Sequence, residues 1–394
     1  MYKNKINIVL LIILCSPAAQ VYASDLMMEA DVIASTSFDD NVDYSTVGNT
    51  VSVYTVKPKL ELAYESDEWK TTSTLYVSEK IYSERLQNQF DNYIDIGTAY
   101  KQDRGVYSVE ASYYNQARRA EETNILGSSV EQVDSKTISV APRYTYNINE
   151  RAFMSIAYAL NSVDFGANTV GRFFSYDTHT AVGSLGYKLS QRSNLNLNLS
   201  AQDYASDNGA SEYQVMSTNL EYGYAVTQIM TAKLSVGSNN FKFENKSTQS
   251  FPYFGSLVTG VTALETTSSG ASYHAGIDAG WLTLGVGRNY VSSSVGGLQQ
   301  SDSVDAKLRM QATPLIGLTL SIIRDEREEK NVYVSSYSDT RTEITPEMIV
   351  SLAHNLQVRA KYTTGEKEIF SSSINRSIDY KRFYVDIRYV FPSI

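Results

Sequence analysis

Charged residues and tyrosines recur at every second position in many segments of this chain, as in Lys57, Lys59 and Glu61. Lysine and arginine attract anions, carboxylates pair with cations, and a tyrosine ring combines an apolar face with a hydroxyl group that contacts sugars well. Twelve basic positions share this spacing: Lys57, Lys59, Lys101, Arg118, Arg143, Lys233, Lys307, Arg309, Arg359, Lys361, Arg382 and Arg388. So do seven acidic positions (Glu61, Asp95, Glu110, Glu221, Asp305, Glu347 and Asp386) and two tyrosines, Tyr114 and Tyr384. We expect these side chains to form one polar, substrate-binding wall.

The spacing of two predicts that β-strands position these residues, because side chains alternate across a strand. Residues 194–201 show it clearly: asparagine and serine alternate there with leucine and alanine. Each such strand has one polar and one apolar face. Because charged residues line the polar face in strand after strand, we assign that face to a water-filled lumen and the apolar face to lipid.

Short and long connections alternate along the chain. The short ones are predicted at 66–68, 103–105, 147–150, 190–193, 227–228, 280, 314–317 and 354–355. The long ones are predicted at 39–50, 83–91, 119–134, 166–176, 205–211, 244–269, 293–301, 328–339 and 368–376. Eight short and nine long connections join eighteen strands, with sixteen and twenty as alternatives. The prediction is an all-β, antiparallel, up-and-down transmembrane barrel with short periplasmic turns and long extracellular loops.

The barrel interpretation makes two further predictions about its faces. Ten tyrosines fall mostly on the apolar face and suit the aromatic girdles at the membrane interfaces: Tyr54, Tyr64, Tyr100, Tyr113, Tyr144, Tyr146, Tyr222, Tyr224, Tyr362 and Tyr389. The polar face leans basic, which favours anions in the lumen. The alternative is that charges of mixed sign only hydrate the wall and brace it through salt bridges.

The first residues predict a secretion signal. Lys3 and Lys5 precede an apolar run over 6–14, and Val21-Tyr22-Ala23 ends in the small residue that signal peptidase requires. We therefore expect a signal peptide over 1–23 and a single barrel over 24–394, with no plug or periplasmic domain. The only cysteine, Cys15, lies within the signal.

Several functions are disfavoured by composition and motifs. The chain has 34 basic and 43 acidic residues and a net charge of −9, which suits no nucleic acid. No phosphate-binding loop or metal-ligand spacing stands out, so we expect no cofactor and no metal. Three histidines (His179, His274 and His354) and many serines leave a Ser-His-acid site open, with His179 following Asp177. We nevertheless predict that the protein is not an enzyme.

Residues 36–42, Thr-Ser-Phe-Asp-Asp-Asn-Val, resemble the opening of the β-barrel porin 2 group of outer-membrane porins. The final segment, 382–391, resembles the C-terminal strand that the barrel-assembly machinery reads, although Asp386 stands where a glycine is usual and 392–394 extend beyond Phe391. Members of this group are commonly found with exopolysaccharide synthesis and export machineries. The resemblance thus implies an outer-membrane porin whose partners are lipid, the assembly machinery, a polysaccharide and export components of the periplasm and inner membrane.

The leading hypothesis is passive passage of a polysaccharide from periplasm to exterior. The alternative is a general or substrate-specific diffusion porin for small anionic solutes, and a third reading is a structural or adhesive barrel with a filled interior. The predicted loop 244–269 separates the first two, because an uptake porin should fold a loop inward as a constriction.

Overall fold

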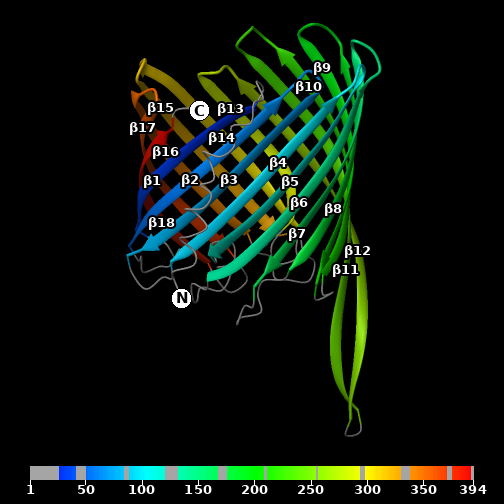
Figure 1. Cartoon of the computed structure of the whole chain (residues 1–394). Coiled ribbons are helices and arrows are strands. Elements are labelled where there is room, and N and C mark those ends of the chain that lie inside the picture. Colours follow the sequence, from blue (N-terminus) through cyan, green and yellow to red (C-terminus); the bar gives the residue numbers. More distant parts are fainter. Residues whose placement is uncertain are drawn as a thin grey trace.

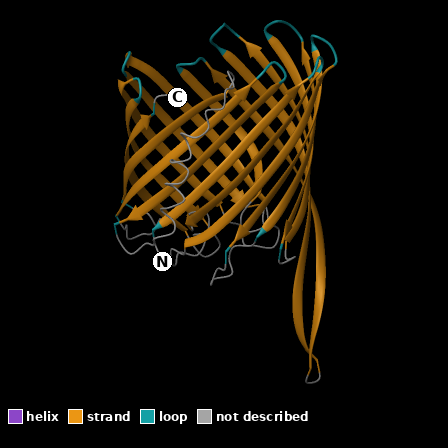
Figure 2. Ribbon diagram, viewed as in Figure 1, coloured by secondary structure: helices purple, strands orange, loops and turns teal. Residues whose placement is uncertain are grey.

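The computed structural model describes residues 26–40, 50–83, 88–119, 132–166, 175–207, 211–253, 256–292, 298–329, 338–370 and 375–391. These residues form eighteen strands arranged as one cylinder (Figure 2). The strands are β1 (Leu26–Asp39), β2 (Val51–Glu65), β3 (Trp69–Tyr82), β4 (Gln89–Lys101), β5 (Gly105–Arg119), β6 (Gln132–Asn147), β7 (Ala152–Phe165), β8 (Tyr176–Lys188), β9 (Ser193–Ser206), β10 (Ser211–Ala225), β11 (Thr231–Tyr253), β12 (Ser256–Asp278), β13 (Leu282–Ser292), β14 (Leu298–Thr313), β15 (Ile316–Glu329), β16 (Ser338–Ala353), β17 (Leu356–Phe370) and β18 (Asn375–Val390). Within the described ranges, no helix is long and apolar enough to cross a membrane.

Every strand pairs antiparallel with its neighbours in the sequence, and β1 pairs with β18, which closes the ring. The predicted class, strand number and up-and-down topology are therefore confirmed. Closure matters because it leaves no strand edge exposed to lipid, where unpaired backbone groups are costly.

Short turns join the strands at the end of the barrel where β1 begins and β18 ends, and all eight lie where the sequence predicted them. Local capping explains several of them. The Asn149 side chain accepts hydrogen bonds from the backbone N–H groups of Arg151 and Ala152, at 2.8 and 2.9 Å. Gly280, in the turn between β12 and β13, has a φ of 76°, which suits glycine because it has no Cβ atom.

The outer face of the barrel is apolar over a continuous band. On β15 the outward positions are Leu318, Leu320 and Ile322, and the next outward residue toward the long connections is Arg324. Aromatic pairs lie at the short-turn end, among them Trp69 with Tyr100 and Tyr107 with Tyr144, with ring centroids 4.7 and 4.2 Å apart. The ten tyrosines predicted to face outward all do so by register. Together they match the lipid band and girdle of outer-membrane barrels.

One predicted loop is wrong. Residues 244–269 do not form an irregular connection: β11 and β12 each run for 23 residues and pair continuously from Thr231 and Asp278 to Tyr253 and Ser256. The hairpin projects beyond the barrel at the long-connection end (Figure 1). Glycines and serines obscured the alternation in the sequence, but β-branched residues such as Val258 and Thr259 favour extended backbone.

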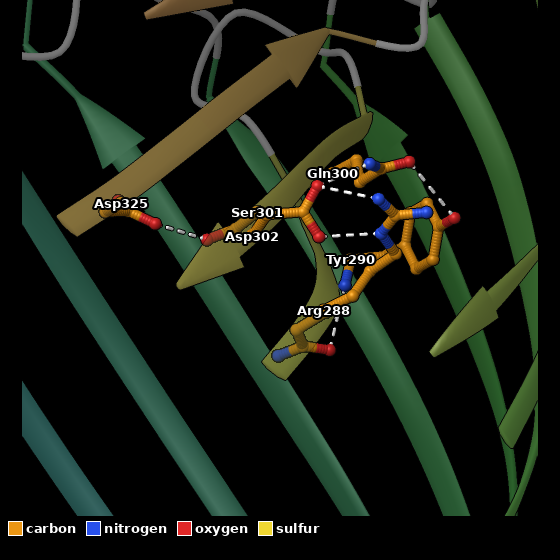
Figure 3. A network of polar contacts seen from close by, with 7 residues as sticks. Arg288, Tyr290, Gln300, Ser301, Asp302 and Asp325 are labelled. Carbon is orange, nitrogen blue, oxygen red and sulfur yellow. Dashed lines mark hydrogen bonds and ion pairs between the residues drawn. The ribbon is translucent and has the colours of Figure 1, made fainter. Parts of the chain in front are cut away.

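The seam between β12 and β13 has the fewest backbone pairs in the ring. Only Tyr273–Asp278 pair with Thr283–Arg288, after which β12 continues into the projecting hairpin. Toward the long connections, β13 pairs with β14 alone. There the Arg288 guanidinium donates to both oxygens of Asp302 at 2.6 and 2.9 Å (Figure 3). Gln300 donates to the same carboxylate, and the Tyr290 hydroxyl donates to Gln300. These side-chain contacts reinforce the pairing of β13 with β14 beside the short seam.

Candidate functional site: the inner wall of the barrel

The register places the predicted polar residues on one face of the sheet. Residues opposite each other in neighbouring strands point to the same side. Lys59 faces Asp31 and Tyr76, and Lys361 faces Tyr384. The same reasoning brings every predicted wall position onto this face, except that the side chain of Arg118 lies outside the described residues. Most large exposed apolar residues occupy the opposite face, so the polar face lines the lumen.

Four of the predicted cations are bound to carboxylates of the wall. Arg388 lies 2.6 Å from Asp31 and 3.4 Å from Glu29, Arg359 Nε lies 2.6 Å from Asp386, Arg382 lies 2.7 Å from Asp39, and Lys59 pairs with Glu61. Two more have other protein contacts. Lys57 sits 3.6 Å above the Tyr76 ring, and Arg309 donates to the Gly280 carbonyl and to Thr283. These six residues brace the wall.

Five predicted cations have no ion pair within the described ranges: Lys101, Arg143, Lys233, Lys307 and Lys361. Five predicted acids likewise have no ion pair within the described ranges: Asp95, Glu110, Glu221, Asp305 and Glu347. Among the predicted wall residues, the charges without an ion pair are therefore balanced in number, which offsets the basic excess on which the predicted anion preference depends.

The sequence interpretation missed acidic residues on the inner face. Glu29, Asp31 and Asp39 all come from β1, where apolar Ile33 shares their face and hides the pattern. Other missed charges pair with each other, as in Lys80 with Asp91 at 2.8 Å. Arg327 with Asp325, Arg341 with Glu343, and Lys367 with Asp339 are further examples.

Tyr114 belongs to a cluster with two tyrosines that the sequence interpretation did not select. Tyr76 and Tyr93 stack with ring centroids 4.8 Å apart, and Tyr114 meets Tyr93 edge-on at 5.7 Å. Lys57 covers the Tyr76 ring. Because these rings cover one another, the cluster stiffens the wall and offers little open face for a sugar to stack on. Tyr384 likewise lies beside a cation, with Arg359 5.6 Å from its ring.

Apolar clusters line the inner face near the long connections. Tyr204 and Tyr213 stack 4.5 Å apart and pack with Val215, Phe241 and Phe243. Smaller clusters join Val163 with Phe165, and Ile369 with Ile378 and Tyr380. The rule that the inner face is the polar one fails here. The sequence does contain a signal for this placement. Phe241 and Phe243 are an even number of residues from Lys233 on β11, so all three side chains point to the same face.

One sector of the wall is almost free of charge. From β7 to β10, the described inner positions of β7 and β9 carry no charged side chain, β8 contributes only Lys188 beside its short turn, and β10 contributes only Glu221. Asparagines occupy this sector. We call Asn194, Asn196 and Asn198 of β9, with Asn219 of β10, the carboxamide ladder; Asn198 and Asn219 lie directly opposite each other.

The histidines do not form a hydrolytic site with the residues described. His179 points outward with its Nδ1 atom 2.5 Å from the Tyr158 hydroxyl, and His354 lies in a turn. His274 is on the inner face opposite Ser235 and Gly287. Across the described ranges, no group of three acidic, histidine or cysteine residues is placed to hold a metal ion.

No family model matches this chain, and no curated protein matches its sequence. Solved structures do resemble it. OpdQ of Pseudomonas aeruginosa is 9% identical with a TM-score of 0.52, and the match covers 94% of this chain and all of OpdQ. OccAB4 of Acinetobacter baumannii is 7% identical with a TM-score of 0.50, covering 95% of this chain and 99% of that one. This similarity is one of fold. With the apolar band and girdle, it identifies the chain as a transmembrane β-barrel of the bacterial outer membrane.

Proposed function

We propose that this protein is a porin of the β-barrel porin 2 type that passes a polysaccharide, or its fragments, from the periplasm to the cell exterior. The observation that carries the proposal is the inner wall. Outside the apolar clusters near the long connections it is polar, with many of its charges held in ion pairs and one sector lined by asparagine. Such a wall hydrates a long hydroxyl-rich chain without trapping it at one strong site.

Two features of the fold support this proposal. Barrels of sixteen to eighteen strands are wide enough to enclose an aqueous channel. The β11–β12 hairpin, the longest pair of strands, projects away from the ring and is not folded into it as a constriction (Figure 1). Transport at this component would be passive, so synthesis and energy come from periplasmic and inner-membrane partners. The signal over 1–23 and the strand at 382–391, read by the assembly machinery, would bring the chain to its membrane.

The second candidate is diffusion of small anionic solutes. The five unpaired cations, among them Lys307 and Lys361, favour it because a mobile anion could replace their missing partners. The two candidates differ in direction and in cargo size.

A deletion strain separates them. We expect the strain to lose secreted polymer and to regain it when the chain is supplied from a plasmid, with uptake of small anions unchanged. Normal polymer secretion together with impaired growth on an anionic nutrient would replace the proposal with the second candidate. The purified barrel in a planar bilayer adds the physical test, because a filled structural barrel would show no conductance.

A further inference from the structure

We infer that the carboxamide ladder is a binding track for uncharged sugar units. This inference rests on the proposed function and names the part of the wall that the cargo contacts. The ladder repeats one chemical group at every second residue of β9, at Asn194, Asn196 and Asn198, and Asn219 extends it onto β10. Steps of two residues in a strand are about 6.6 Å long, so the track offers evenly spaced contacts along a polymer.

The protein itself uses little of the ladder's hydrogen-bonding capacity. Asn196 Nδ2 donates to Glu221 at 3.4 Å, a long bond, and Asn196 Oδ1 is shielded from solvent with no partner among the described residues. Asn198 lies opposite Asn219 and Ser184, which are also uncharged. A buried oxygen without a partner is costly, so turning this carboxamide toward a ligand hydroxyl in the lumen would be favourable.

Glycines opposite the ladder leave room for the carboxamides. A Cβ atom on Gly223 would lie 2.3 Å from Asn194 Oδ1, and one on Gly237 would lie 3.2 Å from Asn219 Oδ1. Larger residues at these positions would push the side chains out of their row. The two glycines therefore leave space for the side chains of Asn194 and Asn219 in their present positions.

The chemistry selects the class of ligand. A carboxamide both donates and accepts hydrogen bonds, as a sugar hydroxyl does, whereas lysine and arginine only donate and a carboxylate only accepts. The middle of the ladder, at Asn198 and Asn219, has only uncharged inner neighbours, and the two flanking charges, Lys188 opposite Asn194 and Glu221 opposite Asn196, are of opposite sign. Weak, repeated and neutral contacts suit a polymer that must bind and then move on.

Current recordings from the full-length barrel in a planar bilayer test the inference, with maltoheptaose as an uncharged probe. We expect maltoheptaose to block the wild-type current transiently. Replacing all four ladder asparagines with alanine should shorten the block about tenfold, since several bonds of modest strength are lost together. Asn→Ser replacement at the same four positions keeps a donor and an acceptor and should retain most of the block.

The matched control is Thr319→Ala with Ser321→Ala, which removes two uncharged polar side chains from the inner face of β15, outside the ladder. We expect this variant to block as the wild type does. Equal shortening in the control and ladder variants, unchanged block in the alanine variant, or no block of the wild type would each overturn the inference. The proposed export function fails separately, if the deletion strain secretes polymer normally while maltoheptaose still blocks the ladder as described.

Discussion

Arg388 on the last strand binds Asp31 on the first strand, with 2.6 Å between the guanidinium Nη2 and the carboxylate Oδ2. The Asp31 side chain is almost fully buried, and only nine residue pairs join β1 to β18. The ion pair thus reinforces the seam at which the two ends of the ring meet.

Replacing Arg388 with glutamine should therefore destabilise the barrel. A buried carboxylate that loses its partner carries an unmet desolvation cost, here about 2 to 3 kcal/mol because Arg388 itself is partly exposed. Urea titration of the barrel in lipid vesicles measures the loss. Lys70→Gln, which breaks an exposed pair with Glu65, should cost less than about 1 kcal/mol. Equal losses in the two variants would contradict the argument.

The unpaired wall cations should set ion selectivity, because bound ones are already neutralised locally. Lys307→Gln with Lys361→Gln removes two positive charges and should shift the reversal potential toward cation preference in a salt gradient. Arg359→Gln with Asp386→Asn removes a complete pair and should leave that potential unchanged. A shift of the same size in both double variants would show that pairing does not matter.

Neighbouring residues on β15 test the assignment of the two faces. Leu320 points outward and Ser321 inward. Arginine at position 320 should cost about 2 to 4 kcal/mol of folding free energy in a bilayer, whereas arginine at 321 should cost little, since it meets water. Both variants are folded into vesicles and compared by gel electrophoresis, in which heating unfolds the barrel and slows its migration. A larger loss at 321 would reverse the faces.

Two glycines with open space around them, which differ in backbone conformation, test the effect of backbone strain alone. A Cβ atom would meet nothing within 4 Å at either Gly280 or Gly183, but only Gly280 has a positive φ. Gly280→Ala should lower stability by about 1 kcal/mol, and Gly183→Ala should leave it unchanged or raise it slightly. Thermal unfolding in one detergent provides the comparison, and similar melting of both variants would remove the strain argument.

Strand number and face assignment could be predicted from the sequence because both depend on local patterns. Alternation as in residues 194–201 defines a strand and its two faces, and short turns such as the one at Gly280 mark its end. The lipid band extends the same alternation around the ring, so the ten tyrosines predicted to face outward followed from it.

Which charges pair could not be predicted, because pairing depends on register between strands. Arg359 and Asp386 are 27 residues apart and meet only when β17 and β18 align. Acids on β1 were missed since Ile33 interrupts their face, and the aromatic cluster around Tyr204 breaks the polar rule of the lumen. The hairpin of β11 and β12 was taken as a loop because glycine and serine dilute its alternation.

In the β11–β12 hairpin, many backbone hydrogen bonds are made between its own two strands, because these strands pair along their full length. An epitope tag placed between Tyr253 and Ser256 should thus leave the ring intact. Antibody applied to living cells would then bind the tag, and the same handle would allow the channel to be captured from whole cells together with whatever cargo it holds.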